Sequence, residues 1–280
     1  MPEVDHAHVE AVERWRAERE ARLREPIGWL SLAGLAWLSE GSNCIGTDSA
    51  NEVVLPSGPR LAGRIVVEGG RATAFGEPGA GLTHGGAPVD GLALTSDADA
   101  PEDEGPTLLE VGPLRLCIIR RAGRLAARTW DTEAAALRTF AGIDHWPIDP
   151  AWRIAARFEP ADPPRRVTVP DVLGHVEDEE SPGDVVFEAA GAAHRLQCLP
   201  GGPDGELWLV FGDETNGRET YAGGRFLYTP PPDADGMVEV DFNRAYNPPC
   251  VFSPYATCPL PWPENRLVVR VEAGERAFHF

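Results

Sequence analysis

Short runs of β-forming residues, separated by glycine or proline turns, recur along most of this 280-residue sequence. In the N-terminal part the candidate strands are residues 52–55, 64–68, 72–75, 92–95, 107–111, 114–120 and 125–130. Gly69-Gly70 and Gly85-Gly86 stand between successive runs, where hairpin connections are expected. This spacing predicts a mostly β fold, built as β-sandwich or barrel-like halves.

A second series of runs follows in the C-terminal part of the chain. Its candidate strands are residues 152–158, 166–169, 184–189, 194–198, 207–211, 226–228, 237–240 and 267–272. Pro147 and Pro150 interrupt the pattern between the two series. We therefore predict a first β half at residues 28–145 and a second at residues 146–280, which together could also form one single domain.

One clear helix is predicted, at residues 6–25, within an N-terminal region that spans residues 1–27. Glu10 and Glu18 each precede an arginine by four residues, which stabilises a helix. The apolar stripe is thin, as expected for a helix on a surface. Pro26 and Gly28 end the helix. A second, short helix is predicted at residues 132–141, after the cap candidate Thr132.

The charge of the chain is strongly lopsided, with 44 acidic and 25 basic residues and a net charge of −19. All of the basic residues are arginine, so chemistry that needs a lysine Schiff base or a P-loop lysine is excluded. The negative field repels phosphate backbones and anionic lipids, and we expect neither nucleic acid nor membrane as a partner. An acid excess without lysine also favours a high-salt cytosol, as in a halophile.

The sequence carries none of several well-known functional motifs. Gly-x-Ser-x-Gly, His-Glu-x-x-His and a Gly-x-Gly-x-x-Gly placed between a strand and a helix are all missing, which gives no support to a Rossmann or α/β-hydrolase fold. We find no secretory leader and no apolar stretch long enough for a transmembrane helix. A cytoplasmic location is therefore expected.

Five cysteines are present, an odd number, and free thiols are the expectation in a reducing compartment. Cys250 and Cys258 have seven residues between them, whereas structural zinc sites usually space cysteines two to four apart. Zinc at this pair would need two histidines brought in by the fold. We expect no cofactor, with zinc at the pair as the less favoured alternative.

Residues 241–266 form the best-marked segment of the sequence. The segment holds six prolines between Pro248 and Pro263, yet it is also rich in aromatic residues, unlike disordered proline-rich chains. We predict a long ordered loop, and loops of this kind usually serve a function. The alternative is that the loop closes one end of a barrel, with its polar side chains satisfying its own backbone.

Residues 241–267 resemble the C-terminal signature of an uncharacterised family, domain of unknown function 1684. The signature reads Asp-Phe-Asn-Arg-Ala-Tyr-Asn-Pro-Pro-Cys, then Tyr-Ala-Thr-Cys-Pro-Leu-Pro and Glu-Asn-Arg-Leu. Residues 28–38, the turn at residues 211–217 and residues 221–227 are similar to other parts of the same family. The family name implies no activity, and no functional residue is transferred from it.

The candidate site consists of two groups of polar residues, and all of them are predicted to be catalytic. The first group is Asp213, Thr215, Tyr221 and Arg225, and the second group is Asp241, Asn243, Arg244 and Tyr246. An arginine, Arg225 or Arg244, would hold a carboxylate or phosphate. An aspartate would act as base, Asp213 or Asp241, and a tyrosine would donate a proton. The alternative for the first group is a β-turn with side-chain caps, which Asp and Asn-Gly favour on their own.

The sequence leaves open whether the chain is an enzyme. The favoured hypothesis is a cytosolic enzyme acting on a small-molecule ligand, with hydrolysis as the first reaction type to consider. The alternatives are a non-catalytic, barrel-like protein that binds a small apolar or aromatic ligand, and an interaction protein that uses the loop as its surface. His145, next to Asp144, is interpreted as a structural histidine, since adjacent strand residues point to opposite faces. The oligomeric state is left open.

Overall fold

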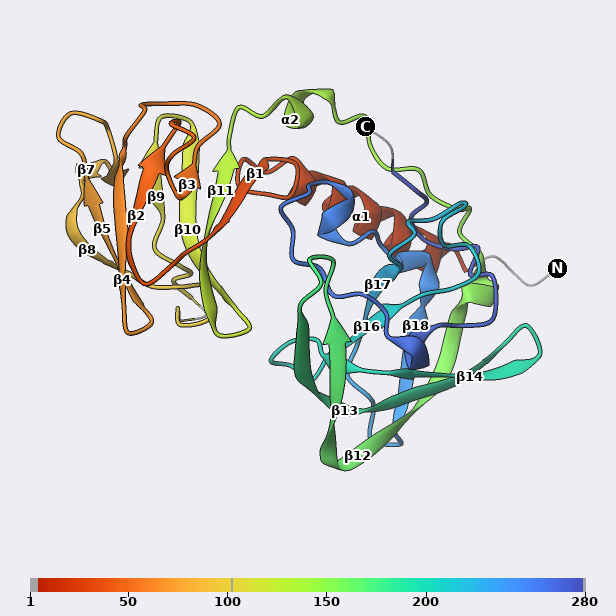
Figure 1. The fold of residues 1–280 in the computed structure, drawn as a ribbon. Helices are drawn as coiled ribbons and strands as arrows, with labels where there is room; N and C mark the ends of the chain where they lie inside the picture. Colours follow the sequence, from red (N-terminus) through yellow and green to blue (C-terminus); the bar gives the residue numbers. More distant parts are fainter. Residues whose placement is uncertain (1–4, 102, 279–280) are drawn as a thin grey trace. The chain divides into compact units, whose positions relative to one another are not determined.

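A computed structural model describes residues 5–101 and 103–278 (Figure 1). The predicted mostly β fold with one N-terminal helix is confirmed, and the sheets of the described residues do not close into a barrel. The chain divides into two compact units, one of Leu23–Phe140 and one of Met1–Arg22 with Ala141–Phe280. The N-terminal helix is thus grouped with the C-terminal half of the chain.

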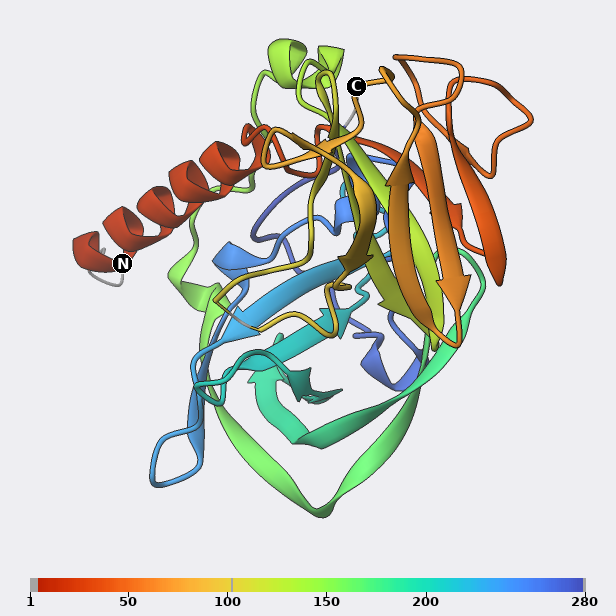
Figure 2. The same ribbon diagram turned by 90° about the vertical axis from the view of Figure 1, so that its left-hand side faces the viewer.

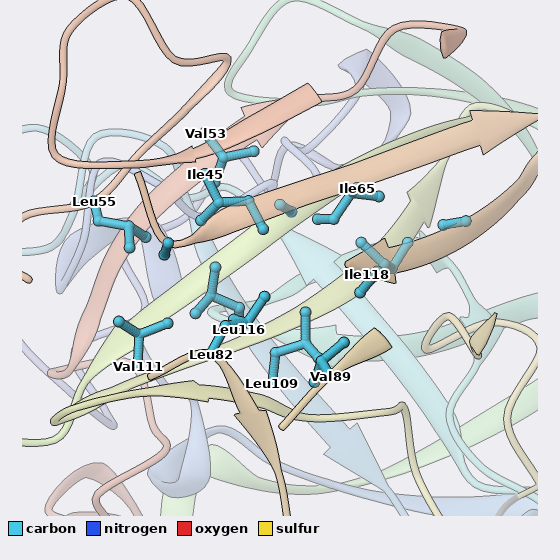
Figure 3. Packing of buried hydrophobic residues seen from close by; sticks show 14 of the residues in the cluster. Ile45, Val53, Leu55, Ile65, Leu82, Val89, Leu109, Val111, Leu116 and Ile118 are labelled. Carbon is cyan, nitrogen blue, oxygen red and sulfur yellow. The ribbon is translucent and has the colours of Figure 1, made fainter. Parts of the chain in front are cut away.

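The unit of Leu23–Phe140 contains two sheets. The six-stranded sheet has the order β1 (Leu32–Trp37), β11 (Arg124–Asp131), β10 (Leu114–Arg121), β9 (Leu109–Val111), β6 (Thr83–His84) and β7 (Ala87–Pro88). The five-stranded sheet has the order β3 (Val53–Val54), β2 (Gly41–Gly46), β4 (Gly63–Glu68), β5 (Arg71–Gly76) and β8 (Asp90–Leu94). Side chains of both sheets share one core, for which Ile45, Ile65 and Ile118 are representative (Figure 3). The unit is therefore a β-sandwich.

The other unit holds the long loop and also two sheets. The four-stranded sheet has the order β14 (Ala192–Gln197), β13 (Val176–Ala189), β12 (Arg153–Pro170) and β18 (Met237–Asp241). The three-stranded sheet has the order β15 (Leu199–Pro200), β16 (Leu207–Phe211) and β17 (Arg225–Thr229). Val185, Leu209, Leu227 and Val240 join the two sheets in one core. This core ends where β16 and β18 end, and the candidate polar residues begin there.

Three strand predictions differ from the structure. The runs at 152–158 and 166–169 belong to the single strand β12. Its pairing with β13 shifts register between Pro160 and Arg165, so the prolines between these two residues do not have to donate a hydrogen bond to the neighbouring strand. The bend of this green hairpin is visible in Figure 2. Residues 41–46, which are not among the predicted strands because Gly41, Asn43 and Gly46 are typical turn residues, form β2 through antiparallel pairing with β4. The predicted strand at 267–272 is absent from the described strands. The backbone of Val271 there bonds to the side chains of Arg225 and Asp213 in place of a neighbouring strand.

The two helices lie where the sequence predicts them. Helix α1 spans His6–Leu23, and α2 is the shorter Ala135–Thr139, which begins after Ala134 and not after Thr132. One face of α1 is buried and mixes apolar with polar residues: His8, Val12, Arg19 and Leu23. Among the described residues, no helix is long and apolar enough to cross a membrane.

The loop after β18 is ordered, as predicted, and three short 3-10 turns divide it. They are η2 (Phe242–Arg244), η3 (Pro249–Val251) and η4 (Pro263–Asn265). Phe242 packs edge-on against Phe211 in the core, with 5.3 Å between ring centroids. Asn265 bonds to backbone groups of β14 and β16. The aromatic residues and the asparagines thus explain why a segment this rich in proline is fixed.

Candidate functional site

Asp213 and Arg225 form a buried ion pair between β16 and β17. The guanidinium is fully buried; its Nη2 lies 2.6 Å from Asp213 Oδ2 and donates to the Val271 carbonyl at 2.8 Å, while Nη1 donates to Ala273. Burial lowers the pKa of Arg225, and the charge of Asp213 opposes that shift. The pair therefore has a structural role, because the Arg225 guanidinium holds the backbone of residues 271–273 at the end of the sheet.

Thr215 belongs to the same network. Its backbone N–H and its hydroxyl both donate to Asp213 Oδ1, at 2.7 and 2.6 Å, and its hydroxyl lies 2.8 Å from that of Thr220. Asn216 closes the turn by donating to Tyr221 O. This is the capped β-turn that the sequence offered as the alternative interpretation, and the groups of Asp213, Thr215 and Arg225 are turned inward.

Asp241 stands at the end of β18 and gathers a second network. Its Oδ1 accepts from the backbone N–H and the side-chain amide of Asn243, at 3.1 and 2.9 Å. Its Oδ2 lies 2.8 Å from His8 Nε2 and 3.4 Å from Arg244 Nε. The structure therefore brings together three predicted site residues, Asp241, Asn243 and Arg244, and adds His8 from helix α1, which the sequence analysis missed.

His8 is buried, with 5% of its surface exposed. The Asp241 carboxylate can only accept from Nε2, which fixes the tautomer with the proton on Nε2 when the ring is neutral. The other ring nitrogen, Nδ1, is then an acceptor, and it has no hydrogen-bond partner among the described residues. A carboxylate that orients a histidine in this way is the arrangement of a general base.

Further polar atoms without a hydrogen-bond partner in the described part of the chain lie on residues around α1. They are Arg16 Nε, His145 Nε2, Trp146 Nε1 and Asn247 Oδ1. Arg16 comes from α1 and donates through Nη2 to the Trp146 carbonyl at 3.0 Å. Buried polar atoms are nearly always paired, so each exception asks for water, an ion or a ligand.

The charges around these atoms influence one another. Burial lowers the pKa of Arg16, while the carboxylates of Glu13, Glu275 and Asp241 raise it. Burial also lowers the pKa of His145, and the Arg16 charge adds to that effect. His145 is therefore neutral in the folded protein near pH 7. The region offers the Arg16 donors beside the neutral ring of His145.

Tyr246 lies in a third contact, which holds α1 on the loop. Arg19 of α1 donates to Glu275, with Nε 3.0 Å from Oε1, and its guanidinium lies 4.6 Å from the centre of the Tyr246 ring. Glu275 is fully buried and also accepts from the Asn247 N–H at 2.7 Å. Burial raises the pKa of Tyr246. Tyr246 thus serves as a packing surface for the arginine, and its phenol stays protonated.

Tyr221, the remaining predicted residue, contacts the cysteine pair. The Cys250 thiol donates to the Tyr221 hydroxyl, with 3.5 Å between Sγ and Oη, and the Cys250 N–H donates to Cys258 Sγ at 3.1 Å. Within the described residues no three His, Cys, Asp or Glu side chains are placed to hold a metal ion. A structural zinc site takes four such ligands, and this pair does not fit one.

The fold and the site define an acidic, mostly β protein. Its N-terminal helix is held by a His8–Asp241 hydrogen bond, by an Arg19 hydrogen bond to the Asn247 carbonyl in the long loop, and by a buried Arg19–Glu275 ion pair. Residues 138–276 match the family model described as "Protein of unknown function (DUF1684)". The resemblance predicted from the loop signature is thereby confirmed for this part of the chain.

Similarity to individual proteins is limited. An uncharacterized protein of Haloarcula marismortui, whose structure was solved by solution NMR, shares 28% sequence identity over 50% of this chain and 78% of its own, with a TM-score of 0.42. No curated protein matches the chain.

Proposed function

We propose that this chain is a cytosolic enzyme that acts on a small anionic molecule, with hydrolysis as the reaction type and the His8–Asp241 pair as its acid–base group. One observation carries the proposal: His8 is buried, one ring nitrogen is held by a carboxylate, and the other is left unpaired. Leaving a buried acceptor unpaired costs about 1–3 kcal/mol, and a catalytic role is one of the explanations for such a group.

Each residue around the pair has a role in this proposal. Asp241 fixes the tautomer and stabilises the imidazolium that forms when Nδ1 takes a proton from an attacking water. The unpaired Nε of Arg16, the Trp146 indole N–H and the partly exposed Arg244 guanidinium are donors that suit a carboxylate or phosphate and a developing negative charge. Asn243 holds Asp241 in place, since it donates to the same carboxylate twice.

The proposal assigns a different role to the first group of predicted residues. Asp213, Thr215 and Arg225 satisfy one another and the backbone of the 271–273 segment, which supports a structural part. Tyr246 likewise supports the position of α1 through Arg19. The proposed chemistry therefore rests on Asp241 and Arg244 among the predicted residues, together with His8 and Arg16.

The test compares variants on a panel of p-nitrophenyl acetate, p-nitrophenyl butyrate and p-nitrophenyl phosphate. We expect His8→Gln and Asp241→Asn to lower kcat/KM on any accepted substrate by about 100-fold or more, the usual contribution of a general base. His6→Gln is the matched control, since His6 is an exposed histidine of the same helix, and it should leave the rate unchanged. Circular dichroism verifies that each variant folds. Equal rates in all four proteins would rule out the His8 assignment.

A non-catalytic role in binding a flat aromatic molecule is the second candidate, and one observation favours it. The Tyr228 ring, which is 46% exposed, is nearly parallel to the rings of Trp208 and Tyr246, with centroids 6.0 and 6.2 Å away. Parallel rings with one exposed member offer a stacking surface. Saturable quenching of tryptophan fluorescence by an aromatic carboxylate, unaffected by His8→Gln and abolished by Tyr228→Ala, would support this role over the first.

A further inference from the structure

Cys250, Cys258 and Tyr221 meet at a second site, which the proposed function does not use. Cys250 lies in the 3-10 turn η3 and is partly exposed, whereas Cys258 is buried. The Cys250 N–H donates to Cys258 Sγ at 3.1 Å, and a hydrogen bond also joins the two thiols. Tyr221 Oη lies 3.5 Å from Cys250 Sγ. One accessible thiol thus has a second thiol and a phenol as direct neighbours.

This environment differs from that of the other buried cysteines. Burial raises the pKa of Cys117 and of Cys198 to about 12, so both remain thiols and are inert. At Cys250 the direction is reversed: the hydrogen bonds with Cys258 and with Tyr221 lower the pKa of its thiol in spite of burial. Burial raises the pKa of Tyr221, so its phenol stays protonated and can donate to the Cys250 sulfur once that thiol has ionised.

We propose that Cys250 reduces a small hydroperoxide, such as hydrogen peroxide, and that Cys258 then closes a disulfide with it. In the first step the Cys250 thiolate attacks one peroxide oxygen, the O–O bond breaks, and hydroxide leaves and takes up a proton to become water. Cys250 is then a sulfenic acid. In the second step Cys258 attacks the Cys250 sulfur, the S–O bond breaks, and the leaving hydroxide takes the Cys258 proton. Two thiols and one hydrogen peroxide give one disulfide and two waters.

The geometry suits the second step because the resolving sulfur is already in place. Cys258 Sγ accepts from the backbone N–H of Cys250 at 3.1 Å, so the resolving sulfur lies directly beside the residue that it would attack. The Cys258 carbonyl accepts from the Val172 N–H at 3.0 Å, which anchors that end of the loop to the β12–β13 hairpin. A resolving thiol next to a partly exposed cysteine of lowered pKa resembles the arrangement of thiols that react reversibly with peroxide.

The test uses the full chain, reduced and then freed of reductant, with hydrogen peroxide added in equal molar amount. Remaining thiols are alkylated, and the products are mapped by mass spectrometry. We expect the loss of two of the five cysteine thiols and a disulfide between Cys250 and Cys258. In Cys258→Ser, dimedone should trap a sulfenic acid at Cys250, and Cys250→Ser should lose no thiol. Cys44→Ser, at a partly buried cysteine of β2, is the matched control and should still form the disulfide.

Tyr221→Phe separates a chemical role of the phenol from a structural one. Removing its hydrogen bond to Cys250 should move the pH profile of the oxidation rate to higher pH, with rates approaching those of the native protein in alkaline solution. Five unreacted thiols after peroxide treatment would overturn the proposal, as would a disulfide that does not contain Cys250. Esterase and phosphatase rates do not enter this test, so its failure is independent of the proposed function.

Discussion

Arg225→Met tests how the first group of polar residues stabilises the fold. The change keeps a long, unbranched side chain but removes the guanidinium, which is fully buried and bonds to Asp213, Val271 and Ala273. The Asp213 carboxylate then stays buried with only the donors of Thr215 and a long contact from the Val271 N–H. Two carbonyls of the 271–273 segment also lose their donor.

The expected cost follows from what is left behind. Removing one member of a buried ion pair costs about 3–5 kcal/mol, because the remaining charge has neither water nor partner. Removing both charges, as in Asp213→Leu with Arg225→Met, leaves no buried ion. We therefore expect the double variant to be less destabilised than the sum of the two single variants. The caps of Thr215 are lost in the double variant, so part of the cost remains.

Urea denaturation followed by circular dichroism measures the free energy of unfolding, and hydrogen exchange locates the effect. Exchange should accelerate in peptides of residues 207–229 and 265–276, while peptides of residues 114–131, in the other unit, serve as internal reference. Arg153→Met is the matched control, because it breaks partly exposed ion pairs with Asp5 and Glu239 and should cost far less. Equal destabilisation by the two substitutions would refute the reasoning.

Three further predictions concern single sites. Gly224→Ala should destabilise by more than about 1 kcal/mol in thermal denaturation, since φ is +88° and a Cβ would lie 2.4 Å from Pro261 Cγ. Ile65→Ala, in the sandwich core, should cost about 2–5 kcal/mol in urea denaturation. The pKa of His145 is lowered from 6.5, so the unfolded chain takes up the proton first and stability falls as pH drops below about 6.5. His145→Gln should flatten the unfolding free energy between pH 5 and 7, as denaturation at several pH values would show.

Local patterns were enough to predict the strands whose partners are near in sequence. The residues of β4 and β5 are joined by Gly69 and Gly70, both with positive φ, so turn chemistry and alternation indicate the same hairpin. The residues of β16 form an apolar run that was predicted with the same bounds, 207–211. β12 was predicted as two strands because its continuity depends on pairing with β13 and β18, and its prolines interrupt the local pattern.

The candidate site could be predicted only in part. The loop showed its own polar residues in the sequence, and Asp241, Asn243 and Arg244 do lie together. His8 gave no signal, because its partner Asp241 is 233 positions away and a helix pattern is interpreted from its apolar residues. The only indication in the sequence was that His8 is in phase with the apolar residues Val12 and Leu23, and a histidine at such a position can be either buried or exposed.

The buried polar atoms of α1 are of two kinds: some attach the helix to the rest of its unit, and others take no part in that attachment. Arg19 attaches the helix to Glu275, and His8 Nε2 attaches it to Asp241. A buried ion pair such as Arg19–Glu275 stabilises little more than apolar residues of the same size would, so it serves mainly to fix which atoms meet. His8 Nδ1 and Arg16 Nε contribute nothing to that attachment and remain without a hydrogen-bond partner in the described part of the chain. Both side chains therefore attach the helix through one nitrogen, His8 to Asp241 and Arg16 to the Trp146 carbonyl, and each keeps a second nitrogen that the proposed function assigns to a small polar ligand.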